Sequence, residues 1–227
     1  RAVGARLGEA NVLQAQGDVL HFLKQTQEAL VKYEQALSLF RSVGAQLGEA
    51  NVLKAQGDVL AFFDEWQDAL AKYEDALQLF RTMSNWLGEA NVLKAQGDVL
   101  YFLKLTDEAL TKYEEALKLF RAVGEQLGEA SVLKAQGDVL AYLNQRQEAL
   151  VKYDEALVLF RAIGSRVGEA NVFHAQGDVF FFLKHTDLAL RRYEDALTLF
   201  RAMGDRLGEA NVLQAQGDVL TFLDQWQ

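Results

Sequence analysis

The stretch LGEANVLKAQGDVL, residues 47–60, decides the fold because close copies of it occur six times in the chain. The copies follow one another at intervals of forty residues, with no insertion, and begin at Leu7, Leu47, Leu87, Leu127, Val167 and Leu207. A fixed period of this length is typical of proteins in which one supersecondary unit stacks on the next. We therefore predict a single repeat domain over residues 1–227, with units 1–40, 41–80, 81–120, 121–160, 161–200 and a partial unit 201–227.

Each period has the pattern of two amphipathic helices. In the second copy, apolar or small residues follow the three-to-four spacing of one helical face from about residue 47 to residue 63. A short polar break at residues 64–66 precedes a second run of the same spacing, which extends to about residue 83. Breaks this short favour antiparallel neighbours. The prediction is an all-α fold of about eleven helices, six first helices and five second helices, which form a solenoid.

The composition excludes several classes of protein. Half of the 227 residues are hydrophobic, which is enough for a core, and proline is absent, which suits an all-helical chain. The formal net charge of -9 does not favour nucleic-acid binding, which needs clustered Lys and Arg. No apolar run is long enough to span a membrane. The absence of cysteine excludes disulfides and thiolate metal sites, and it fits the reducing cytoplasm, where we expect the protein to function.

The spacing of small and aromatic residues resembles that of the tetratricopeptide repeat, a helix–turn–helix unit. In the second copy the matching positions are Leu53, Gln56-Gly57, Leu60, Ala69, Tyr73 and Ala76, followed by Arg81 where the family has proline. The forty-residue period is similar to that of the longer variety, found in spindle-orientation adaptors and in the arrays of bacterial and fungal signalling NTPases of the STAND class. The resemblance implies a right-handed superhelix whose concave surface is lined by the first helices.

Glycine and glutamine recur at fixed places in every copy. We expect a left-handed glycine after each second helix, at Gly4, Gly44, Gly124, Gly164 and Gly204, with Ser84 in the third copy. The resemblance implies that mid-helix glycines such as Gly57 let the paired helix, with Ala69 and Ala76, approach closely. Gln56 and its equivalents stand where the family usually has leucine. Their amides are predicted either to bond the tyrosine of the same repeat, such as Tyr73, or to be half-buried and meet water.

No constellation of residues in the sequence supports catalysis, and we predict no enzymatic activity, no cofactor and no metal site. The histidines, His21, His174 and His185, occupy unrelated places in the repeat. His174 and Asp178 have i,i+4 spacing, but two ligands without a third make a weak metal site. Paired carboxylates such as Glu114 and Glu115 recur on a polar helix face, which indicates solvation rather than a unique catalytic centre.

The polar stripe of the first helices is the candidate binding surface. The resemblance places this stripe on the wall of a groove, where Asn side chains can give one donor and one acceptor to a peptide backbone. Lysines would add positive charge at the centre of the array, and aromatic residues would add apolar pockets. The alternative is that the polar residues are merely solvated and the aromatics belong to the core. The candidate peptide-binding residues are Asn11, Asn51, Lys54, Asp58, Phe62, Asn91, Lys94, Asp98, Phe102, Ser131, Lys134, Asp138, Tyr142, Asn171, His174, Asp178, Phe182 and Asn211.

The functional prediction is a protein–protein interaction scaffold that binds a peptide or a partner segment, with neither nucleic acid nor a membrane as partner. One alternative is that the array is the sensor arm of a larger signalling NTPase. Another is a near-consensus array, duplicated or designed, that has no specific ligand. Near-identity of the copies favours this last alternative, because a groove that reads one peptide should vary along its length.

The two ends of the sequence lead to a further expectation. Arg1-Ala2-Val3 reads as the closing turn of a second helix, and Trp226-Gln227 as the loop before another one. Because the copies are nearly identical, faces left open at the two ends should complement each other. We therefore expect head-to-tail self-association that rises with protein concentration.

Overall fold

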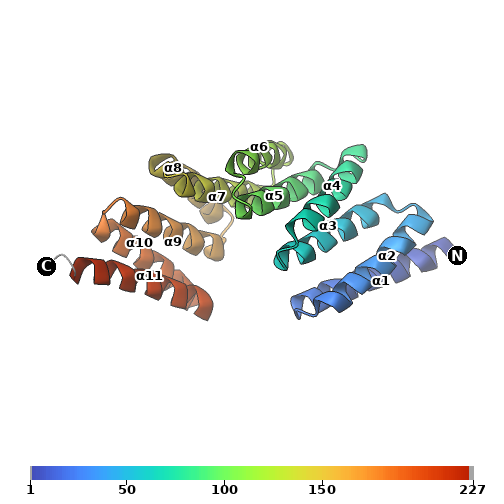
Figure 1. Ribbon diagram of the computed structural model, residues 1–227, viewed down its shortest axis with the longest axis horizontal. Helices are drawn as coiled ribbons and strands as arrows, with labels where there is room; N and C mark the ends of the chain where they lie inside the picture. Colours follow the sequence, from blue (N-terminus) through green and yellow to red (C-terminus); the bar gives the residue numbers. More distant parts are fainter. Residues whose placement is uncertain (1, 225–227) are drawn as a thin grey trace. The chain divides into compact units, whose positions relative to one another are not determined.

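The computed structural model describes residues 2–224, and all regular secondary structure in that range is α-helical. Figure 1 shows the helices following one another through short connections. Their bounds are α1 Ala2–Phe22, α2 Thr26–Val43, α3 Gln46–Phe62, α4 Trp66–Thr82, α5 Trp86–Phe102, α6 Thr106–Val123, α7 Gln126–Tyr142, α8 Arg146–Ala162, α9 Arg166–Phe182, α10 Thr186–Met203 and α11 Arg206–Asp224. The predicted all-α solenoid and its two helices per period are confirmed, with helix bounds within about two residues in the second copy.

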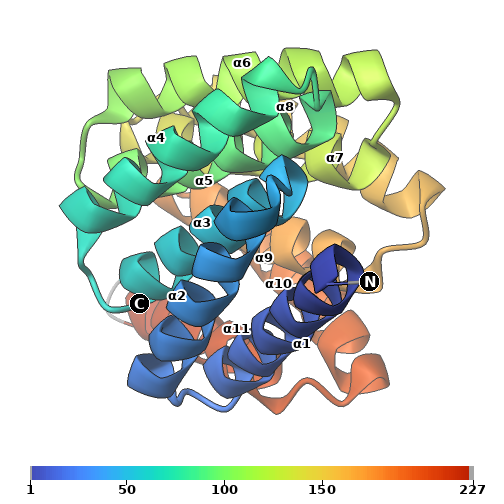
Figure 2. The same cartoon turned by 90° about the vertical axis from the view of Figure 1, so that its right-hand side faces the viewer.

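Internal contacts divide the chain into two compact units, Arg1–Val123 and Gly124–Gln227. In the first unit, the pairs α1–α2, α3–α4 and α5–α6 pack internally, and each pair packs on the next through its second helix. Figure 2 shows α1, α2 and α3 in the foreground as neighbouring rods. In the second unit, α7–α8 and α9–α10 are the internal pairs, and α11 packs on α10.

A residue with left-handed backbone conformation follows first helices and second helices alike. After second helices, Gly44 and Gly204 have φ near +70°, and Ser84 takes the same role at φ +52°. The bonds from Gly44 N–H to the Arg41 carbonyl (3.2 Å) and from Ala45 N–H to the Phe40 carbonyl (2.9 Å) form a Schellman motif. The first helices are followed by non-glycine residues with φ of 59° to 64°, which were not predicted: Lys24, Asp64, Lys104, Asn144 and Lys184.

The N-terminal end differs from what the sequence predicted. Gly4 is not a left-handed cap, because it lies within α1. Ala2 and Val3 likewise belong to α1 rather than to the close of a separate helix, since the backbone continues without a break through Phe22. The expected loop at Trp226-Gln227 lies outside the described residues.

Within each helix pair, a tyrosine ring lies against a glycine. A Cβ atom placed on Gly57 would be 2.5 Å from Cε1 of Tyr73, and one on Gly97 would be 2.6 Å from Cε1 of Tyr113. Both tyrosines are 1–2% exposed, so neither ring can move into solvent. The predicted packing role of these glycines is therefore confirmed, but the group that requires them is the tyrosine ring rather than Ala69 or Ala76.

Successive pairs are joined by a second close approach and an ion pair. A Cβ on Gly88 of α5 would be 2.3 Å from Cδ1 of Phe80 in α4, so the glycine of the LGEA segment is also a packing position. Next to it, Nε of Arg81 donates to Oε1 of Glu89 at 2.8 Å. Arg81 occupies the position where the family has proline, and it makes a contact to the next repeat that proline could not make. The same ion pair recurs at Arg41–Glu49, Arg161–Glu169 and Arg201–Glu209.

The recurrent glutamines also connect neighbouring pairs, and the predicted bond to tyrosine is wrong. Nε2 of Gln56 donates to Glu34 of the preceding second helix at 3.2 Å, and Nε2 of Gln176 donates to Asp154 at 2.7 Å. The tyrosine hydroxyls are instead taken by aspartates. Gln56 and Gln96 are 4% exposed, and their Oε1 atoms have no hydrogen-bond partner among the described residues. Each of these buried amides thus has a hydrogen-bonded nitrogen and an oxygen without a partner among the described residues.

We expect Gly97→Ala to destabilise the chain by about 1–3 kcal/mol, because the added methyl overlaps the buried ring of Tyr113. Gly217→Ala is the matched control, since it lies at the same repeat position and its Cβ would meet no described atom within 4 Å. There the higher helix propensity of alanine should stabilise by up to about 1 kcal/mol. Chemical denaturation followed by circular dichroism measures both, and equal effects would refute the tyrosine contact.

We expect Gln96→Leu to stabilise the chain by about 1 kcal/mol, because the leucine removes a buried carbonyl oxygen that has no partner. Gln16→Leu is the control, since Gln16 is exposed and the substitution should change stability little. Thermal unfolding of both variants measures the difference. Destabilisation by Gln96→Leu would show that the bond from Nε2 of Gln96 to Oε2 of Glu74, at 3.5 Å, outweighs the cost of the unpaired oxygen.

Candidate functional site

The predicted site residues lie on one surface of the first helices, which we call the first-helix face. In the first unit it is carried by α1, α3 and α5, and in the second by α7, α9 and α11. Adjacent first helices contact each other within each unit, α1 with α3 and α3 with α5, and α7 with α9 and α9 with α11. Residues at equivalent repeat positions therefore form rows on each unit.

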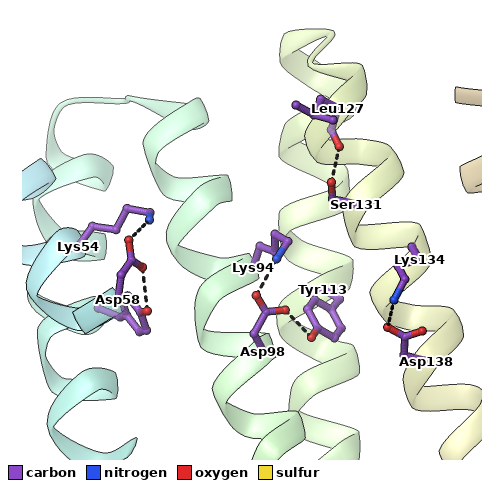
Figure 3. Close-up of polar contacts among 10 residues, drawn as sticks. Lys54, Asp58, Lys94, Asp98, Tyr113, Leu127, Ser131, Lys134 and Asp138 are labelled. Carbon is purple, nitrogen blue, oxygen red and sulfur yellow. Dashed lines mark hydrogen bonds and ion pairs between the residues drawn. The ribbon is translucent and has the colours of Figure 1, made fainter. Parts of the chain in front are cut away.

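A lysine and a tyrosine share the carboxylate of each central aspartate on this face. Nζ of Lys54 lies 2.6 Å from Oδ2 of Asp58, and the hydroxyl of Tyr73 donates to Oδ1 of the same side chain at 2.9 Å. Lys94, Asp98 and Tyr113 repeat this arrangement at 2.6 and 2.8 Å, as Figure 3 shows. In the second unit Lys134 binds Asp138 at 2.7 Å, and Tyr153 donates to it at 2.8 Å. The positive charge predicted for the centre of the face is thus neutralised locally.

The outer copies lack the lysine. Asp18 accepts from the Tyr33 hydroxyl at 2.7 Å, but position 14 is a glutamine, and no ion pair to Asp18 is found in the described part of the chain. In the fifth copy, Nε2 of His174 lies 3.9 Å from Oδ1 of Asp178, too far for a strong bond. Asp18 therefore adds negative charge to the first-helix face of the first unit.

Burial and the neighbouring aspartates change the ionisation of these groups. Burial raises the pKa of Tyr73 far above its ordinary value of 10.0, and the negative charge of Asp58 adds to the effect. The pKa values of Tyr33 and Tyr193 are raised for the same reasons. Burial also raises the pKa of the Asp178 carboxyl, while His174 and the bond from Tyr193 act in the opposite direction. The tyrosines therefore stay protonated and act only as donors.

The aromatic row is exposed rather than part of the core. Phe62 is 56% exposed, Phe102 is 62% exposed and Phe182 is 67% exposed. Trp66, at the start of α4, stacks on Phe102 with ring centroids 5.4 Å apart and an interplanar angle of 11°. Exposed aromatic side chains beside charged groups are typical of binding surfaces. The alternative that these residues fill the core is therefore wrong.

A pocket of about 440 Å³ opens on the first-helix face of the first unit. Its aromatic walls come from Phe62, Trp66 and Phe102, and its acidic groups are Asp58, Asp64 and Asp98. His21 of α1 also lines it and meets Phe62 edge-on at 6.0 Å. Four of the predicted site residues, Asp58, Phe62, Asp98 and Phe102, are thus brought together. His21, Asp64 and Trp66 were not among them, because the residue type at these positions varies between copies and the predicted rows consist of repeated positions.

None of the asparagines of the predicted row lines this pocket. Asn11, Asn51, Asn91, Asn171 and Asn211 are exposed, and Ser131 is half-buried. The Asn91 amide donates to the Leu87 carbonyl at 3.0 Å, and the Ser131 hydroxyl donates to the Leu127 carbonyl at 2.7 Å (Figure 3). The Asn91 donor that was predicted for a peptide backbone is therefore directed to its own helix.

Residues 2–224 contain no group of three or more His, Cys, Asp or Glu side chains arranged to hold a metal ion. In the same range, no helix is both long and apolar enough to cross a bilayer.

This arrangement of stacked helix pairs, with exposed side chains in rows on the first helices, defines the class of helical repeat proteins. A sequence model of the tetratricopeptide repeat matches residues 8–82 and 88–162, about two thirds of the chain. The chain belongs to the tetratricopeptide repeat family. A comparison with curated protein sequences gives no significant match.

Solved structures of the same fold have low sequence identity to this chain. Aspartyl phosphate phosphatase F from Bacillus subtilis superposes with a TM-score of 0.86 at 13% identity, over 99% of this chain and 59% of its own. The Rap conjugation gene regulator of the plasmid pLS20, in complex with the Phr* peptide, gives 0.75 at 18% identity, over 95% and 62%. A STAND protein with a tetratricopeptide repeat sensor from Pyrococcus horikoshii gives 0.72 at 14% identity, over 97% and 37%. The chain thus spans less than two thirds of the length of these proteins.

The tyrosine–aspartate bonds predict a loss of stability at alkaline pH. Unfolded tyrosine releases its proton near pH 10, whereas folded Tyr73 does so at a higher pH. Stability from this group is therefore complete below about pH 10 and falls as the pH rises toward the folded pKa, by about 1.4 kcal/mol per pH unit for each such tyrosine.

Tyr73→Phe should make this alkaline slope shallower, and at neutral pH it should destabilise by about 1–3 kcal/mol because a bond to a carboxylate is lost. Thermal unfolding from pH 7 to pH 11 measures both effects. An unchanged slope in the variant would contradict the protonated, donor-only role of Tyr73.

Proposed function

We propose that this protein is an interaction scaffold that binds an extended peptide segment of a protein partner along its first-helix face. The observation that carries the proposal is the exposed row of aromatic side chains, Phe62 and Phe102, beside the acidic pocket of the first unit. Large exposed aromatic groups are costly in water and become favourable when a partner covers them. We also propose that residues 1–227 form one repeat domain, because the forty-residue period runs through the sequence without interruption.

The fold neighbours support a peptide as the partner. The Rap regulator that shares 18% identity with this chain is described in complex with a peptide. One neighbour is named a phosphatase, but it shares only 13% identity with this chain, which spans 59% of its length. We accordingly propose binding rather than catalysis. The net charge of the chain, -9, disfavours nucleic acid as the partner.

A second candidate is a sensor array of a larger signalling NTPase. The observation that favours it is the superposition on the STAND protein that has a tetratricopeptide repeat sensor, of which the chain spans 37%. In that case the first-helix face would bind the signal, and binding would be transmitted to a nucleotide-binding domain. Detection of a nucleotide-binding domain in the same polypeptide, with hydrolysis that responds to ligand, would distinguish this function from a passive scaffold.

We expect peptides that bind to shift the NMR signals of Asn91, Lys94 and Asp98 before those of any second helix. A library of random heptapeptides titrated against the isotopically labelled chain provides the measurement. The control is the exposed face of α4, where Asp68 and Gln78 should stay unchanged. Shifts confined to the second helices would refute the proposed face. A lack of any saturable shift would favour the remaining alternative, an array without a specific ligand.

A further inference from the structure

We propose that the pocket bounded by Phe62, Trp66 and Phe102 binds the guanidinium group of an arginine in the partner peptide. This inference rests on the proposed function and specifies the side chain that the face selects. The pocket combines flat aromatic walls with carboxylates, and this is the environment that a planar cation prefers.

The charges around the pocket favour a cation. Asp58 and Asp98 are each paired with a lysine, so together with Lys54 and Lys94 they add no net charge. Asp64 lies in the connection between α3 and α4, is exposed and has no ion-pair partner in the described part of the chain. The carboxylates of Asp64, in the pocket, and of Asp18, which accepts the Tyr33 hydroxyl on the neighbouring first helix, are not neutralised by a cation among the described residues and leave this region negative. A partner side chain with positive charge is complementary to it.

The second unit contains an internal example of the proposed contact. Arg146 occupies the repeat position of Trp66, and its guanidinium lies over the ring of Phe182, 5.4 Å from the centroid. The same guanidinium donates from Nη2 to Oδ1 of Asn144 at 2.8 Å. Phe182 and Asn144 are the repeat equivalents of Phe102 and Asp64. In the second unit the aromatic and loop positions therefore hold a guanidinium.

The first unit offers a related environment. A carboxylate at Asp64 replaces the amide of Asn144, and Trp66 stacks on Phe102 from the repeat position that Arg146 occupies in the second unit. His21 lines the pocket as well, and its Nδ1 atom is buried without a hydrogen-bond partner among the described residues. An arginine from a peptide would gain ring stacking and a charged acceptor at one place.

The test uses three pentapeptides, acetyl-Ala-Ala-Xaa-Ala-Ala-amide, in which Xaa is arginine, lysine or citrulline. The side-chain indole signal of Trp66 in the full chain is followed by NMR up to about 10 mM peptide, since single-side-chain affinities fall in the millimolar range. We expect saturable shifts that are strongest for arginine, weaker for lysine and weakest for citrulline, which keeps the shape of arginine without its charge. Equal shifts for arginine and citrulline, or none for arginine, would overturn the inference.

Two variants that copy residues of the chain itself locate the site. Asp64→Asn reproduces Asn144, which has the same left-handed backbone, and it should weaken arginine-peptide binding about 2- to 5-fold. Trp66→Arg reproduces Arg146, should fill the pocket with its own guanidinium, and should weaken binding about tenfold or more, read from the amide signals of Phe62 and Phe102. Asp68→Asn makes the same charge change on the second helix, and it should leave binding unchanged.

These outcomes separate the inference from the proposed function. If Asp68→Asn weakens binding as much as Asp64→Asn, the attraction is diffuse and the pocket is not a guanidinium site. If library peptides bind the first-helix face without any preference for arginine, the scaffold function stands and the inference fails. If neither the arginine peptide nor the library shifts first-helix signals, both fail.

Discussion

The structure depends on a tyrosine ring that lies on a glycine backbone. In each complete repeat the mid-helix glycine removes the side chain that would separate the two helices, and the tyrosine fills the space. The hydroxyl then reaches an aspartate one residue beyond the glycine, at 2.9 Å for Tyr73 and Asp58. One side chain therefore sets the spacing within the helix pair and fixes the acidic row of the first-helix face. Packing and surface chemistry have the same origin in this fold, because the adjacent residues Gly57 and Asp58 supply the contact to the tyrosine ring and the acceptor for its hydroxyl.

The sequence predicted much of this architecture because its signals are repeated. The forty-residue period and the three-to-four spacing led to the all-α fold, and glycine after the second helices led to the left-handed caps at Gly44 and Gly204. The partners of individual polar groups were less predictable. Gln56 was expected to bond tyrosine or water, whereas it donates to Glu34 of the preceding repeat. Such a contact depends on the offset between successive pairs, and hydrophobic spacing within one pair carries no information on that offset.

The candidate site shows the same difference between repeated and unique positions. The rows of Asp, Lys and Phe were predicted, and Asp58, Phe62, Asp98 and Phe102 do line one pocket. His21, Asp64 and Trp66, which also line it, were missed because the residue type at each of these positions varies between copies. Asparagine was expected to offer donors to a peptide, but Asn91 bonds its own helix. The residues that distinguish the surface of one repeat from that of another lie at variable positions, which the periodicity of the sequence does not reveal.

The position occupied by Trp66 illustrates how such an array can diversify. In the other complete repeats its equivalents are Thr26, Thr106, Arg146 and Thr186, each at the first residue of a second helix. The helix accepts a hydroxyl, an indole or a guanidinium there without any change in its bounds of more than one residue. Different positions of the forty-residue repeat therefore determine binding and folding. When repeats are duplicated or exchanged in evolution, what each section of the surface binds can change while the packing of the core stays the same.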